Sequence, residues 1–124
     1  MDPVRPSNAD PVREKLRQRG AAEHVIRDGA DGLISRWREF VGQAEQGYPF
    51  GLADYRNDLD TRTLIGFVGL ADRVRSEDER FRSLLRHSDR AVWSSDAADA
   101  FWVYGYPANA AGELLDDLRR EGLA

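Results

Sequence analysis

Apolar residues recur at helical spacing over much of the chain, and the clearest case lies between residues 31 and 46. The apolar positions there are three or four residues apart, and polar side chains fill the positions between them. This is the pattern of a helix with one buried face. The stripe consists of Leu33, Ile34, Trp37, Phe40, Val41 and Ala44. The spacing predicts a helix over about 31–46 that ends at Gly47.

A second strongly apolar region follows between residues 52 and 71. One helical face carries Leu52, Tyr55 and Leu59. From residue 63 to residue 71 the sequence is apolar nearly all round, which is typical of a buried segment. Gly66 and Gly69 each cost about 1 kcal/mol relative to Ala in a helix, unless close packing compensates. The pattern leaves open whether 52–75 is one helix or two. The short link of residues 48–51 turns the chain, so we expect the two apolar helices to pack antiparallel.

The N-terminal part predicts shorter elements. Residues 1–9 are rich in Pro and polar residues and are expected to be a flexible lead-in. Asp10 is a suitable cap for a helix that begins at Pro11, and this helix should end at Gly20. Residues 21–27 are expected to form a turn or a second short helix.

The C-terminal part combines helical and extended signals. Ser76 and Glu79 match the S-x-x-E capping box, which predicts a helix over about 77–88. The aromatic and β-branched segments 91–93 and 101–104 predict two short strands or extended packing segments. Two strands alone are marginal in water, so they should lie on the helices. A last helix should follow Pro107 and bury Leu114, Leu115 and Leu118.

Together these patterns predict a mainly α fold. We expect a single-domain antiparallel helical bundle over residues 10–124, with a short two-stranded or extended aromatic element near the C-terminus. The length of 124 residues suits one domain. The apolar fraction of 41% and the charged fraction of 32% describe a folded, highly charged protein rather than a disordered one.

Charge and composition narrow the function classes. The net charge of −4 argues against nucleic acid as the principal partner. The chain has no Cys, which excludes disulfides and thiolate metal sites. No signal peptide is visible at the N-terminus, and the longest apolar run, residues 64–71, falls short of the about 20 residues that a membrane span needs. We therefore expect a cytoplasmic protein with no membrane partner and no cofactor.

The acidic block between residues 54 and 62 is the first candidate site. Asp54, Asp58 and Asp60 offer oxygen ligands for a hard cation, and the first two are one helical turn apart. The spacing does not follow the Ca²⁺-loop pattern. Asp58 with Arg62, and Arg56 with Asp60, are also ion-pair partners at i,i+4 spacing. We interpret the block first as ion-paired helix, with metal binding as the minority alternative.

Other chemistry-bearing residues form no catalytic pattern. His24 and His87 are the only histidines, and neither lies in a zinc or general-base motif. No nucleophile elbow or phosphate-binding glycine pattern is present, so an enzyme is the less favoured class. Arg82, Arg86 and Arg90 fall at i, i+4 and i+8, a stripe that could follow a phosphate backbone. A solvated helix face explains the same spacing equally well.

The favoured hypothesis is a small acidic bacterial protein-binding module, an immunity- or antitoxin-like inhibitor. Trp and Tyr are common anchors of binding surfaces, although core and rim packing is their default role. The candidate partner-binding residues are Tyr48, Asp54, Asp58, Trp93, Trp102, Tyr104 and Tyr106. An acidic binder can mask a basic target such as a nuclease and associate quickly by electrostatic steering. The alternatives are a small metal-binding protein or enzyme that uses the three aspartates, and nucleic-acid binding through the arginine stripe.

Three motifs carry a resemblance to known proteins. They are Trp37-Arg38-Glu39-Phe40-Val41, Gly47-Tyr48, and the block from Asp54-Tyr55 through Asn57-Asp58-Leu59-Asp60 to Arg62. In these the chain resembles a set of small uncharacterised bacterial proteins with a W-x-x-F-V segment, a G-Y turn and a D-Y-x-N-D-L-D-x-R block. The resemblance covers most of residues 30–107. It implies a compact bacterial single-domain protein and brings no established activity.

Overall fold

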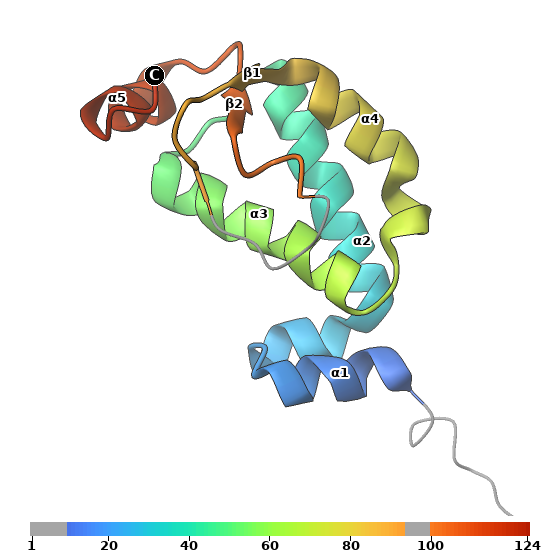
Figure 1. Ribbon diagram of the computed structural model, residues 1–124. Coiled ribbons are helices and arrows are strands. Elements are labelled where there is room, and N and C mark those ends of the chain that lie inside the picture. The colour runs from blue at the N-terminus through green and yellow to red at the C-terminus, as the bar shows by residue number, and fades with distance from the viewer. Residues whose placement is uncertain (1–9, 94–99) are drawn as a thin grey trace, which may run out of the picture.

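The protein is mainly helical and has one small antiparallel sheet, as the computed structural model in Figure 1 shows for residues 10–93 and 100–124. The helices are α1 (Pro11–Arg19), α2 (Glu23–Gln46), α3 (Leu52–Phe67), the 3-10 helix η2 (Ala71–Val74), α4 (Arg75–Leu84) and α5 (Gly112–Arg120). The strands are β1 (Leu85–His87) and β2 (Gly105–Pro107). Within these ranges no helix has the length and apolar character that crossing a membrane requires. The predicted lead-in, residues 1–9, lies outside the described residues.

Helix α2 is the centre of the fold, and α1, α3 and α4 all pack against it. Its predicted apolar stripe is buried along its whole length, from Leu33 to Ala44. Trp37 and Phe40 stack on each other, with ring centroids 5.1 Å apart, and both rings contact Phe81 of α4 edge-on. The stripe therefore became the core, as its helical spacing predicted.

The long helix α2 joins two predicted elements across a break at Gly29. This residue has φ 62° and ψ −151°, so the helical hydrogen-bond pattern is interrupted there. The guanidinium of Arg13 in α1 compensates, because it donates to the carbonyl oxygens of Ile26 (3.0 Å) and Arg27 (2.8 Å). Asp10 caps α1 as predicted, accepting from the Arg13 backbone N–H at 3.0 Å. These bonds fix α1 against the first turns of α2.

Helix α3 is a single helix that ends at Phe67, which answers the question left open for residues 52–75. Figure 1 shows α3 crossing α2 obliquely as the chain returns towards α1. A Cβ at Gly66 would lie 3.4 Å from Nη1 of Arg62, at ordinary van der Waals contact with that guanidinium. The N-terminus of α3 has no side-chain cap of its own. Instead Asp117 of α5 accepts from the Leu52 N–H at 3.0 Å.

Helix α4 differs from its prediction at both ends. It begins at Arg75, directly after η2, and no side chain caps it, so the predicted capping box of Ser76 and Glu79 is wrong. The reason is that η2 leads straight into α4, which places Ser76 inside the helix rather than before it. The helix ends at Leu84, not at residue 88, because Leu85 turns to extended backbone and starts β1.

The two-stranded sheet exists, but not where the aromatic segments predicted it. The register pairs Leu85 with Pro107, Arg86 with Tyr106 and His87 with Gly105. A Cβ at Gly105 would lie 3.0 Å from the Leu85 side chain, so only glycine fits this pairing without movement. The predicted strands 91–93 and 101–104 are bends and turns. They still meet once, where the Val92 N–H donates to the Val103 carbonyl at 2.7 Å.

Helix α5 packs on α3 and completes the core near the C-terminus. Leu114 and Leu118 are fully buried, as predicted, and Leu123 joins them. Leu115 is only half-buried. The amphipathic pattern therefore predicted the buried side of this helix but made it wider than it is.

Candidate functional site

The outer side of α3 carries the acidic residues that the sequence singled out. We call this surface the α3 face and define it by Glu39 of α2 and by Asp54, Asn57, Asp58 and Asp60 of α3. All five are exposed or half-buried. The opposite side of α3 is buried through Tyr55, Leu59 and Ile65, so the helix presents this polar side to solvent.

Asp58 is the most constrained acid of the α3 face. The hydroxyl of Tyr48, which is buried, donates to its Oδ2 atom at 2.6 Å. Burial raises the pKa of the Asp58 carboxyl, the bond from Tyr48 lowers it, and the charges of Asp54 and Glu39 raise it, with a net upward shift. Burial and the neighbouring Asp58 carboxylate raise the pKa of Tyr48 as well, so the phenol stays a neutral donor. Asp58 therefore sits in a surplus of negative charge.

The acids of the α3 face differ from about half of the acids in the described residues, which have an arginine partner. Paired acids include Asp28, Glu45, Glu77, Asp78, Asp117 and Glu121. Within residues 10–93 and 100–124, no ion pair involves Glu39, Asp54 or Asp58. These three carboxylates share one surface and are not neutralised by the protein itself.

The ion pairs predicted within the acidic block are wrong. Arg62 lies on the buried side of α3, so its guanidinium reaches Asp78 of α4 instead of Asp58. Arg56 donates to the Glu121 carboxylate at 3.0 Å and to the Val92 carbonyl at 2.9 Å, away from Asp60. Tertiary partners outcompeted the i,i+4 neighbours because they hold the arginines in several bonds at once.

Asp60 has an aromatic partner instead of a basic one. The indole Nε1 of Trp93 donates to its Oδ1 atom at 2.7 Å, and the Arg56 guanidinium lies 6.0 Å from the centroid of that indole. A hollow of about 310 Å³ lies beside this contact, lined by Ala53, Arg56, Asn57, Asp60 and Trp93. Trp93 is therefore docked on α3 at the edge of the α3 face.

A second hollow, of about 420 Å³, lies between α3 and the start of α2, and we call it the α2–α3 hollow. Its apolar wall is formed by Ala21, Val25 and Leu64, and its polar wall includes His24, Asn57, Asp58, Asp60 and Thr61. Arg36 also lines it, but its guanidinium is held by Asp28 at 2.7 Å. Asn57 and Asp60 line both hollows, so they form the ridge between them.

The metal-binding alternative receives no support from this arrangement. Asp58 turns to Tyr48 and Asp60 turns to Trp93, so the three aspartates do not converge on one point. In the described part of the chain no group of three or more acidic or histidine side chains could hold a metal ion. His24 is exposed at the start of α2, and His87 in β1 stacks on Tyr104 at 6.4 Å between ring centroids.

The predicted arginine stripe does not form, because α4 ends before two of its members. Arg82 is in α4, and its guanidinium lies 4.4 Å from the centroid of the Phe101 ring. Arg86 is in β1, and Arg90 follows the strand and donates to the Glu121 carbonyl at 2.8 Å. These side chains do not share a helix face, so the spacing argument for a phosphate backbone no longer holds.

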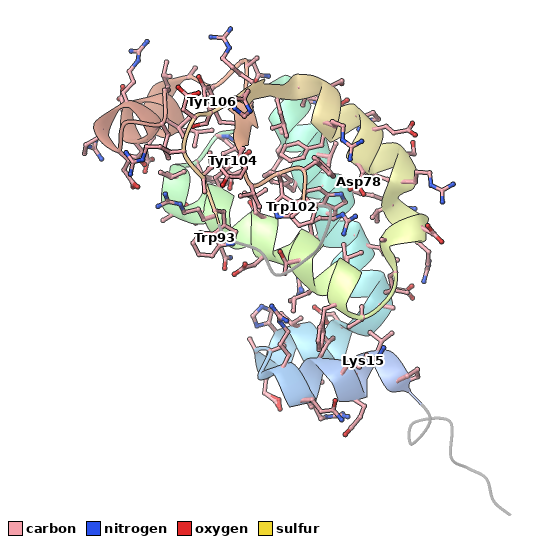
Figure 2. The ribbon with its side chains drawn as sticks, in the orientation of Figure 1. Lys15, Asp78, Trp93, Trp102, Tyr104 and Tyr106 are labelled. Atoms are coloured by element: carbon pink, nitrogen blue, oxygen red, sulfur yellow. The ribbon has the colours of Figure 1, made fainter. Side chains whose placement is uncertain are left out.

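The aromatic candidates divide into core and surface residues. Figure 2 shows Trp102 inside the fold and Trp93 along α3. Tyr48, Trp102 and Tyr106 are buried, and Trp93 is half-buried. Only Tyr104 among them is strongly exposed, at 52%. The three buried residues are therefore part of the core and do not form a binding surface themselves.

Sequence reasoning missed Phe50, another exposed aromatic residue, which packs on Tyr48, the hydrogen-bond donor to Asp58 of the α3 face. It is 47% exposed, and its ring contacts the Tyr48 ring edge-on at 5.7 Å. A Cβ on the next residue, Gly51, would clash with the carboxylates of Glu113 and Asp117 of α5, so two acidic groups lie against this turn. The exposure of Phe50 could have been predicted from its position between Pro49 and Gly51, because an aromatic residue in such a turn belongs to no helical stripe.

The chain matches no protein-family model, no curated protein and no solved structure. The geometry and charge of the α3 face are therefore the observations that bear on function.

Proposed function

We propose that the protein is a protein-binding module that binds a basic protein partner through the α3 face. The observation that carries the proposal is that Glu39, Asp54 and Asp58 lie close enough for their charges to raise the pKa of Asp58, and that none of the three has an ion pair among the described residues. Binding sites are where such uncompensated charge is expected, because the partner supplies the missing counter-charge.

Electrostatics gives this surface two advantages as a binding site. Unpaired carboxylates on one surface create a negative potential that speeds the approach of a basic partner. Asp58 is also held in place by Tyr48 at 2.6 Å, so its carboxylate is already oriented. An oriented, half-buried carboxylate forms stronger charge-assisted hydrogen bonds than a mobile one on a surface.

The partner class that fits is an enzyme with a basic substrate-binding surface, such as a nuclease. A small acidic protein bound there would exclude the phosphate backbone, which is how an immunity- or antitoxin-like inhibitor would act. The proposal treats residues 10–124 as one domain, a bundle with α3 antiparallel to α2, since a fixed binding face needs rigid support. It also places the protein in the cytoplasm, which cell fractionation would test.

Affinity capture from the source organism tests the proposal when it compares matched variants. The test variant is Glu39→Gln/Asp54→Asn/Asp58→Asn, which neutralises the α3 face. The control variant is Asp31→Asn/Asp72→Asn/Glu79→Gln, which removes the same charge from three exposed positions elsewhere. Circular dichroism should show equal helix content for all three proteins.

We expect a basic protein to be retained by the wild type and by the control variant but lost from the test variant. Retention should weaken as salt is added, since exposed charges are screened. With the purified partner, calorimetry should give an affinity at least about tenfold lower for the test variant, which corresponds to about 1.4 kcal/mol. Equal retention on both variants, or the lack of any basic partner, would contradict the proposal.

A further inference from the structure

We infer that the α2–α3 hollow is the seat for one arginine side chain of the partner. This inference rests on the proposed function, and it adds to it the residue type that the partner must present. It is carried by the coincidence in one hollow of about 420 Å³ of an apolar wall and of two carboxylates that have no basic partner within the described residues.

The walls of the hollow match the two parts of an arginine side chain. Val25 and Leu64 provide apolar surface for the methylene stem. Asp58 and Asp60 provide acceptors for the guanidinium, and each has one oxygen outside its bond to Tyr48 or Trp93. A planar guanidinium has several donors in a fixed fork and is weakly hydrated, so it can bond a carboxylate of this wall in a partly enclosed site better than an ammonium group can.

The number of carboxylates separates this hollow from the smaller one on the other side of the ridge. Each hollow is lined by one arginine that has an acidic partner, since Arg36 bonds Asp28 at 2.7 Å and Arg56 bonds Glu121 at 3.0 Å. The α2–α3 hollow is lined by two carboxylates, Asp58 and Asp60, whereas the smaller hollow is lined by Asp60 alone. The arginine therefore belongs in the α2–α3 hollow.

The test uses small probes, so that it does not depend on knowing the partner. The probe is N-acetyl-arginine-methylamide, and its matched control is N-acetyl-citrulline-methylamide, which has nearly the same shape and no charge. Titrations of the ¹⁵N-labelled full chain are followed by NMR. We expect saturable shifts at residues 21–25 and 57–64 with the arginine probe, and shifts at least about fivefold smaller with citrulline at equal concentration. Equal shifts with both probes would overturn the inference.

Three variants connect the shifts to the hollow. Ala22→Phe fills the hollow from an exposed position with extended backbone and leaves the charge unchanged. Asp58→Asn removes one acceptor charge. Asp54→Asn removes a charge from the α3 face at a residue that does not line the hollow. The arginine shifts should disappear in the first two variants and persist in the third, with the fold of each confirmed by circular dichroism.

The outcomes distinguish this inference from the proposed function. If Ala22→Phe binds both the arginine probe and the captured partner as tightly as the wild type, the arginine seat is wrong while the acidic binding face stands. If Ala22→Phe abolishes the arginine-probe shifts and weakens partner binding at least about tenfold, the arginine seat and the acidic binding face both hold. If the triple neutralised variant keeps the partner, the proposed function fails, and the inference that the hollow seats an arginine of that partner is overturned with it.

Discussion

Arg62 and Asp78 form a bidentate ion pair inside the fold. Nε of Arg62 lies 2.9 Å from Oδ1 of Asp78, and Nη2 lies 2.8 Å from Oδ2. The side chains are only 6% and 13% exposed. The Trp37 indole donates to the same Oδ1 at 2.9 Å, and the guanidinium lies 5.0 Å from the centroid of the Trp102 ring. One polar contact therefore joins α2, α3 and α4.

Breaking this pair should destabilise the protein strongly. Arg62→Met leaves the Asp78 carboxylate buried without a counter-charge, and such losses cost about 3–5 kcal/mol. Arg62→Met/Asp78→Asn should cost clearly less than the sum of the two single changes, because no charge is left unpaired while Asn still accepts from Trp37. Urea unfolding followed by tryptophan fluorescence gives the free energies of unfolding. Arg80→Met, at the exposed pair with Glu45, is the control and should change stability much less.

Two glycines of α2 should respond to alanine in opposite directions. Gly29→Ala places a side chain at φ 62° and ψ −151°, and its Cβ would lie 3.1 Å from Nη2 of Arg13. We expect a loss of about 1–3 kcal/mol. Gly42→Ala adds a Cβ within the helix where no atom lies within 4 Å, so it should stabilise by about 0.5–1 kcal/mol. Thermal unfolding of both variants checks the pair, and a similar loss at both sites would contradict the role given to the Gly29 break.

Asp58→Asn should stabilise the protein at neutral pH, because burial first, and then the charges of Asp54 and Glu39, raise the pKa of this carboxyl. Between its ordinary pKa of about 3.9 and the raised value, the folded state holds the proton that the unfolded state releases. The free energy of unfolding of the wild type therefore falls as pH rises through this window. The advantage of the variant should be absent below the ordinary pKa and constant above the raised one, as urea unfolding at several pH values would show.

Asp117→Asn provides a control of opposite sign. The hydrogen bond from the Leu52 backbone N–H lowers the pKa of the Asp117 carboxyl, and Arg120 lowers it further. This carboxylate stabilises the fold above its ordinary pKa, and the contribution is lost as pH falls through the lowered value. The variant should thus be less stable than the wild type at neutral pH. A gain in stability at neutral pH for Asp117→Asn would show that the pH argument is wrong for both residues.

The sequence by itself determined that the fold is mainly helical and, for the helix around residues 31–46, which side is buried. The stripe from Leu33 to Ala44 was sufficient because burial of apolar surface is set by spacing along a single helix. The Asp10 cap was predictable for the same reason, since its partner lies three residues away. The acidic character of the α3 face also followed from sequence alone.

Only the tertiary structure decided where the charged groups go and where the sheet forms. Arg62 pairs with Asp78 rather than with Asp58, and strand β1 begins at Leu85. The ion pair and the strand pairing each require two segments that are distant in sequence to pack together. For the same reason the sequence could not show that Asp58 is held by Tyr48 while its expected partner is buried elsewhere. Helical periodicity is a local property that can be read from the sequence. Which surface is left without counter-charge depends on all the ion pairs that form between distant segments, so only the tertiary structure shows it.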